Sequence, residues 1–68
     1  MFDKKCNRVM NDILDSNGFA PKERLEALFD LMTENAHSLF HRKWAETILL
    51  ETIERQLTEN HLSLRDFI

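Results

Sequence analysis

This sequence has very few of the residues that cross-link, interrupt or stiffen a chain. Its 68 residues include one cysteine, one glycine and one proline, and no tyrosine. Because a single cysteine has no partner within the chain, an intrachain disulfide is excluded. No apolar run approaches the ~20 residues of a membrane span, and none follows the charges at the N-terminus, so we expect neither a membrane protein nor a signal peptide. We therefore expect a cytoplasmic protein, in a compartment where thiols stay reduced.

The chain also lacks a surplus of positive charge. Twelve acidic residues against nine lysines and arginines give a formal net charge of −3. A protein whose main partner is a phosphate backbone normally carries a clear basic excess, so this balance disfavours nucleic-acid binding as the main function. A local basic face stays open as an alternative. In that case the protein is a small DNA-binding transcriptional regulator that uses Lys4, Lys5, Arg8, Arg42 and Lys43.

The few helix-breaking residues make the organisation of the chain simple to predict. Gly18 and Pro21 mark the one strong break, and Pro21 suits the first turn of a helix. Apolar residues recur at helical spacing on both sides of the break, whereas the alternation typical of strands is absent. The phase of the apolar pattern changes near residues 35–38, which predicts a turn there with Asn35 or Ser38 as a cap. One long bent helix is the alternative.

These breaks predict an all-α fold, a small three-helix bundle that occupies residues 1–68 as a single domain. We place its helices at about residues 3–17, 21–35 and 39–59, followed by a short apolar C-terminal tail. Within the tail, Ser63 is followed three residues later by Asp66, a spacing typical of a capping pair, which predicts a short helical turn.

The third predicted helix carries an unusually wide apolar surface. On a regular helical wheel its apolar residues spread over roughly 240°, against the ~100° stripe with which a surface helix meets its core. We interpret this surface as two faces. Ala45, Leu49 and Ile53 are expected to face the core of the chain. Trp44 and Leu50 lie at opposite margins of the stripe and are expected to meet a second chain.

This wide surface predicts a homodimer whose interface is formed by the third helix and the tail. The predicted interface residues are Phe40, Trp44, Ile48, Leu49, Leu50, Ile53, Leu57, Leu64 and Phe67. The function is then binding rather than catalysis, by a small non-enzymatic intracellular regulatory or adaptor protein that engages itself and another protein. Compact acidic helical chains are frequent among accessory proteins of phages and mobile elements, an association at the level of the fold alone.

The remaining candidate sites have simpler explanations. His37 and His41 have the i,i+4 spacing of metal ligands, so a metal-dependent helical domain is a further alternative, but a zinc site needs three or four ligands. Cys6 is in phase with the apolar stripe of the first helix and fits the core better than a nucleophile. A chain without long loops is a poor host for a pocket. We therefore predict no catalytic residue, no metal site and no cofactor.

Overall fold

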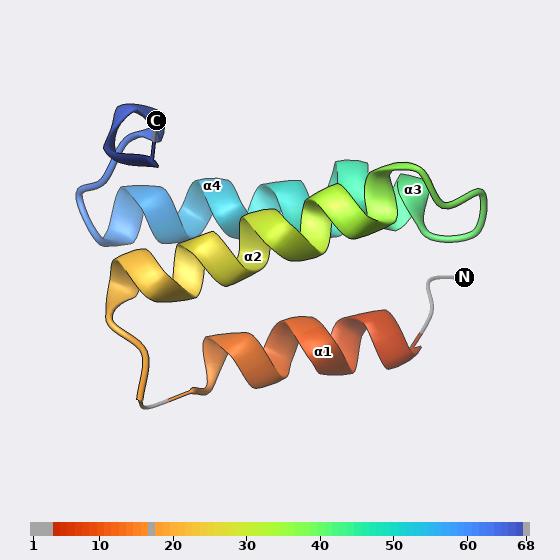
Figure 1. Cartoon of the computed structure of the whole chain (residues 1–68), viewed down its shortest axis with the longest axis horizontal. Coiled ribbons are helices and arrows are strands. Elements are labelled where there is room, and N and C mark those ends of the chain that lie inside the picture. Colours follow the sequence, from red (N-terminus) through yellow and green to blue (C-terminus); the bar gives the residue numbers. More distant parts are fainter. Residues whose placement is uncertain (1–3, 17, 68) are drawn as a thin grey trace.

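The computed structural model describes residues 4–16 and 18–67, and within those ranges it contains helices and turns but no strand. Helix α1 spans Lys4–Leu14 and helix α2 spans Pro21–Ala36. A third helical rod is continuous and consists of α3 (Arg42–Trp44), the π-helical turn η1 (Ala45–Leu49) and α4 (Leu50–Glu59). A short 3-10 turn, η2 (Leu64–Phe67), follows. Figure 1 shows α2 lying between α1 and the third rod in the view, which confirms the predicted all-α three-helix bundle.

The break between the first two helices lies where the sequence predicts it. α2 begins at Pro21, whose missing N–H is not needed in a first helical turn. The carbonyl of Ala20 accepts the first bond of this helix from the Arg24 N–H at 2.9 Å. α1 ends at Leu14 instead of the predicted residue 17, because the Asp-Ser pair that follows favours turns over helix interiors. The predicted boundary positions 3 and 17 themselves lie outside the described residues.

A turn at residues 37–41 separates α2 from α3, as the change of apolar phase predicts. Ser38 caps this turn. Its hydroxyl oxygen accepts hydrogen bonds from the N–H groups of Phe40 and His41, each at 3.3 Å. Its carbonyl accepts a bond from the Arg42 N–H at 2.9 Å. Because these contacts end one helix and begin the next, the single long bent helix is excluded, and the third rod begins at Arg42 rather than at the predicted residue 39.

The π-helical turn η1 changes which side chains of the third rod face the core. The Leu50 N–H bonds to the Ala45 carbonyl, so this turn holds one residue more than an α-helical turn. In a regular helix Trp44 and Leu49 would point about 140° apart. The wider turn brings both into the core, where Trp44 is 1% exposed and Leu49 is 0% exposed. The prediction that Trp44 lies at an exposed margin is therefore wrong, whereas Leu50, 37% exposed, does lie at one.

The core lies where the three rods meet and is built mainly from the predicted apolar stripes. Its buried hydrophobic residues are Cys6, Met10, Leu25, Leu28, Trp44, Ala45, Leu49 and Ile53. Trp44 also joins the third rod to α1, because its indole N–H donates a hydrogen bond to the Oδ1 of Asn7 in α1 at 2.7 Å. A buried indole N–H needs such a partner. Cys6 is buried, as its position in the stripe of α1 predicts.

The chain reverses direction sharply at the end of α4. Asn60 ends the helix, as predicted, and His61 takes a left-handed conformation with a φ of 55°. The Leu62 N–H then bonds back to the Leu57 carbonyl at 2.9 Å, and the His61 N–H bonds to the Thr58 carbonyl at 3.2 Å. These two bonds satisfy carbonyls that the helix end would otherwise leave unpaired.

The reversal brings the C-terminal tail back against its own chain. The predicted capping pair forms, since the Ser63 N–H donates a hydrogen bond to the Asp66 Oδ2 at 2.7 Å. This turn places the Phe67 ring edge to face against Phe29 of α2, with the ring centroids 5.2 Å apart. The Nζ of Lys22 lies 5.8 Å from the centroid of the same Phe67 ring. Phe67 thus packs within the monomer and is partly buried there.

Candidate interaction surface

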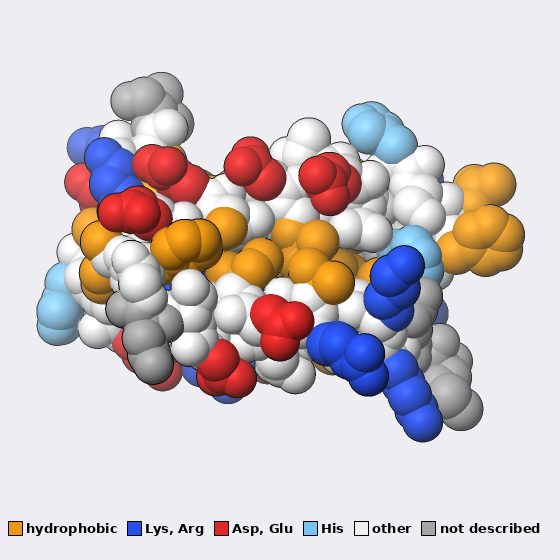
Figure 2. Space-filling model, turned by 60° about the horizontal axis from the view of Figure 1, so that its bottom comes forward, with side chains coloured by type: hydrophobic (Ala, Val, Ile, Leu, Met, Phe, Trp, Pro, Cys, Tyr) orange, Lys and Arg blue, Asp and Glu red, His pale blue; other side chains and the backbone are white. Residues whose placement is uncertain are grey.

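The turn between α2 and α3 carries the most exposed large hydrophobic side chains of the described residues. Leu39 is 93% exposed and Phe40 is 90% exposed, whereas the next, Leu64, is 58% exposed. We name Leu39 and Phe40 the apolar tip. Figure 2 shows a hydrophobic projection standing clear of one end of the molecule, where this turn lies. Two adjacent apolar side chains held in solvent add nothing to the core, and such a patch is typical of an interaction surface.

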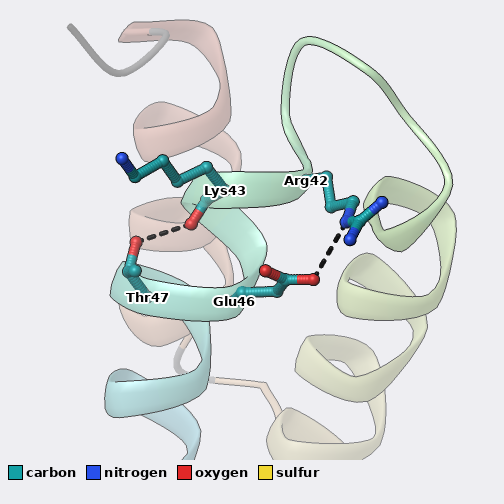
Figure 3. A network of polar contacts seen from close by, with 4 residues as sticks. All are labelled: Arg42, Lys43, Glu46 and Thr47. Atoms are coloured by element: carbon teal, nitrogen blue, oxygen red, sulfur yellow. Dashed lines mark hydrogen bonds and ion pairs between the residues drawn. The ribbon is translucent and has the colours of Figure 1, made fainter.

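A hollow of about 430 Å³ lies beside the apolar tip and is lined by Leu39, Arg42, Lys43, Glu46 and Thr47. Figure 3 shows the two contacts that order its wall. The Arg42 Nε donates to the Glu46 Oε1 at 3.0 Å, and the Thr47 hydroxyl donates to the Lys43 carbonyl at 2.6 Å. The ion pair joins residues four apart on the helix, but both side chains are exposed, so it is worth only about 0.3–0.5 kcal/mol. Arg42 and Lys43 leave the helix on opposite sides (Figure 3).

Cationic side chains share the end of the molecule that carries the apolar tip. The Trp44–Asn7 hydrogen bond of 2.7 Å holds the first turns of α1 beside α3. Lys5 and His41 accordingly line one hollow of about 240 Å³. Figure 2 shows Lys and Arg side chains gathered near the hydrophobic projection. The structure therefore brings to one end the cations that the sequence singles out, on α1 and on α3: Lys4, Lys5, Arg8, Arg42 and Lys43.

The opposite end of the molecule carries a hollow of different character. It has a volume of about 520 Å³ and lies between the middle of α2 and η2. Its apolar lining comes from Phe29, Leu64 and Phe67, and its two charged lining residues are Glu26 and Asp30, both exposed. We name this site the acidic hollow. The Nζ of Lys22 lies beside this hollow, 5.8 Å from the centroid of the Phe67 ring that lines it.

The predicted interface residues are divided between the core and three separate places on the surface. Those that are fully buried within one chain are Trp44, Leu49 and Ile53, and those that are partly buried against the core are Ile48, Leu57 and Phe67. Phe40 lies in the apolar tip, Leu50 on α4, and Leu64 in the acidic hollow. No continuous apolar face therefore runs along the third rod, because the π-helical turn η1 rotates part of it inward.

Four residues of these two surfaces are missing from the predicted site. Leu39 belongs to the apolar tip, and Glu26, Phe29 and Asp30 line the acidic hollow. The exposure of Leu39 could have been predicted from the sequence, because a Leu-Phe pair directly after a predicted capping serine must lie in or next to a turn. The acidic hollow could not have been predicted, because it depends on how the tail folds back onto α2.

The two histidines do not form the helical pair that a metal site would use. His37 ends α2, whereas His41 lies in the turn before α3, so they share no helix. Among the described residues, no group of three or more His, Cys, Asp or Glu side chains is placed to hold a metal ion. Nor does any helix of the described ranges combine the length and hydrophobicity that a membrane crossing requires.

Comparison with known proteins does not extend this description. The chain was compared with protein-family models, with curated proteins and with solved structures, and none of the three comparisons finds a match. A function for this chain must therefore be inferred from its own surfaces.

Proposed function

We propose that this protein is a non-enzymatic regulatory or adaptor protein that acts by binding other protein chains, a second copy of itself included. Its anchor is the apolar tip. The observation that carries the proposal is the near-complete exposure of Leu39 and Phe40. Burying a Leu or Phe side chain is worth about 1.5–3 kcal/mol relative to leaving it in water. A chain that keeps two such residues exposed gains that free energy only when a partner covers them.

The backbone beneath the apolar tip supports an anchoring role. Ser38 accepts hydrogen bonds from the N–H groups of Phe40 and His41, each at 3.3 Å, so the turn has a defined conformation before any partner arrives. A preorganised loop loses less conformational entropy on binding than a loop that must first become ordered. The exposed side chains of Arg42 and Lys43 next to the tip give it the polar rim that surrounds the apolar centre of many interfaces.

Photocrosslinking tests this proposal in cells that make the protein. We place the photoreactive residue p-benzoylphenylalanine at position 40, and expect discrete adducts with other protein chains. The matched control carries the same residue in place of Glu51, which is also exposed but lies on α4 away from the tip. Adding Leu39→Asp to the first variant should reduce its adducts several-fold. Equal adducts from positions 40 and 51, or none from position 40, would contradict the proposal.

The gathering of cations supports a second candidate function, that of a small DNA-binding regulator. Cations from two distant stretches of sequence, on α1 and on α3, lie at one end of the molecule, although the net charge of −3 opposes this function. Binding of this kind weakens steeply as salt rises, because counterions are released from the phosphates. A gel shift that is present at low salt, and lost in a Lys4→Glu and Lys5→Glu variant, would favour it. The absence of any shift at low salt would remove it.

A further inference from the structure

We propose that the apolar tip of one copy docks into the acidic hollow of a second copy, so that chains associate head to tail. This inference rests on the proposed function and names the surface of the second copy that receives the anchor. The two surfaces are placed to meet, since the tip projects from one end of the molecule (Figure 2) and an open hollow lies near the other.

The two surfaces match in polarity at their centres. The tip presents Leu39 and Phe40, and the hollow of about 520 Å³ presents Phe29, Leu64 and Phe67. The Phe29 and Phe67 rings meet edge to face at 5.2 Å, and an aromatic ring from a second copy can add in the same manner beside the Lys22 Nζ, which lies 5.8 Å from the Phe67 centroid. Leu64 is itself more than half exposed, so the hollow, like the tip, has apolar surface to cover.

The two surfaces also match in charge at their rims. Glu26 and Asp30 are four residues apart on α2, and like charges at this spacing destabilise a helix slightly. Lys22, four residues before Glu26 on α2, offsets part of that repulsion, and a cation from a second copy offsets more of it. Arg42 and Lys43 flank the tip and supply such cations, with Glu46 beside them as the ion-pair partner of Arg42. Complementary charges of this kind increase the rate of encounter and select the orientation of docking.

The positions of the two surfaces decide the form of the assembly. They lie at opposite ends of a molecule that is 31 Å long, so the tip of one chain cannot bind in the hollow of the same chain. A contact between two copies therefore leaves one tip and one hollow uncovered. Further copies can bind at these two sites, so the assembly either closes into a ring or grows as an open filament. A two-fold dimer, by contrast, stops at two chains. A contact made of so few residues is small, and we expect it to be weak and transient.

Complementation between two variants tests this inference. The tip variant carries Leu39→Asp and Phe40→Asp and keeps its hollow, whereas the hollow variant carries Leu64→Asp and keeps its tip. All three positions are exposed, so both variants should fold, which circular dichroism checks. The matched control is Leu50→Asp, an exposed position of α4 outside both surfaces. Sedimentation velocity over a range of protein concentrations is the readout.

We expect the average mass of the wild type and of the control to rise with concentration beyond two chains. Each variant alone should associate at least tenfold more weakly, and an equimolar mixture of the two should form a 1:1 dimer and grow no further. A wild type that stops at two chains, or a hollow variant that associates like the wild type, overturns the inference. A wild type that stays monomeric also overturns it, while adducts from position 40 to other proteins would leave the proposed function intact.

Discussion

At the scale of single residues, Trp44 shows best what the sequence can and cannot predict. Ile53 is buried as its helical spacing predicts, because the helix around it is regular, and Leu25 and Leu28 of the regular helix α2 are buried as well. Trp44 is buried against the prediction, since its direction depends on a wider turn that follows it. Its partner Asn7 lies 37 positions away in the sequence, and no periodicity indicates a hydrogen bond between two helices.

The hydrogen bond between Trp44 and Asn7 gives a prediction for stability. Asn7→Ala leaves the buried indole N–H without its acceptor, and an unsatisfied buried donor costs about 1–3 kcal/mol. We expect urea unfolding to show a loss of this size. Asn11→Ala is the matched control, because Asn11 is an exposed asparagine of the same helix. Equal losses in the two variants would show that the bond does not stabilise the fold.

The left-handed residue at the end of α4 gives a second prediction. His61 has a φ of 55°, a conformation that costs a residue with a side chain about 1 kcal/mol or more and costs glycine little. His61→Gly should therefore raise the free energy of unfolding by about 1 kcal/mol in urea titrations. His61→Ala removes the imidazole but keeps the conformational cost, and should give no such gain. A gain in both variants would assign the effect to the ring instead.

At the scale of the elements, the boundaries were largely predictable and the π-helical turn was not. α2 begins at Pro21 as expected and Asp66 makes the predicted cap, because these residue types act locally. Ser38 caps the turn before α3 and not the helix itself, whose N-cap residue is His41. A π-helical turn has no comparable local signature. Its one trace in the sequence is the apparent width of the apolar surface, roughly 240°. On a wheel drawn at about 3.6 residues per turn, an extra residue makes an apolar stripe of normal width look too wide.

Single-residue deletions test this account of the third rod. Deleting Thr47, an exposed residue of η1, converts the wide turn into a regular one and keeps Trp44 and Leu49 on the same face. Deleting Glu51, an exposed residue of the regular helix α4, turns Ile53 out of the core. We expect thermal unfolding to show a small change for the first variant and a loss of about 3 kcal/mol or more for the second. The reverse order would contradict the account.

At the scale of the whole molecule, the most exposed apolar side chains lie at the two ends, in the apolar tip and, for Leu64, in the acidic hollow. Val9, Phe19 and Leu50 are exposed to a lesser degree, at 38%, 40% and 37%, and Figure 2 shows further hydrophobic side chains along the middle of the molecule. Of the residues that the sequence predicts for an interface, the structure buries Trp44, Leu49 and Ile53 within one chain and leaves Phe40, Leu50 and Leu64 exposed. Trp44 and Leu49 are buried together because of η1, since a regular helix would point them about 140° apart.

The central claim, that the apolar tip is the association surface of this chain, is tested most directly by its mass in solution. Sedimentation equilibrium up to about 1 mM compares the wild type with the Leu39→Asp and Phe40→Asp variant and with Leu50→Glu. We predict a mass above the 8.1 kDa monomer for the wild type and for Leu50→Glu, and 8.1 kDa for the tip variant. A wild type of 8.1 kDa throughout, or an association that Leu50→Glu abolishes and the tip variant keeps, would contradict the account.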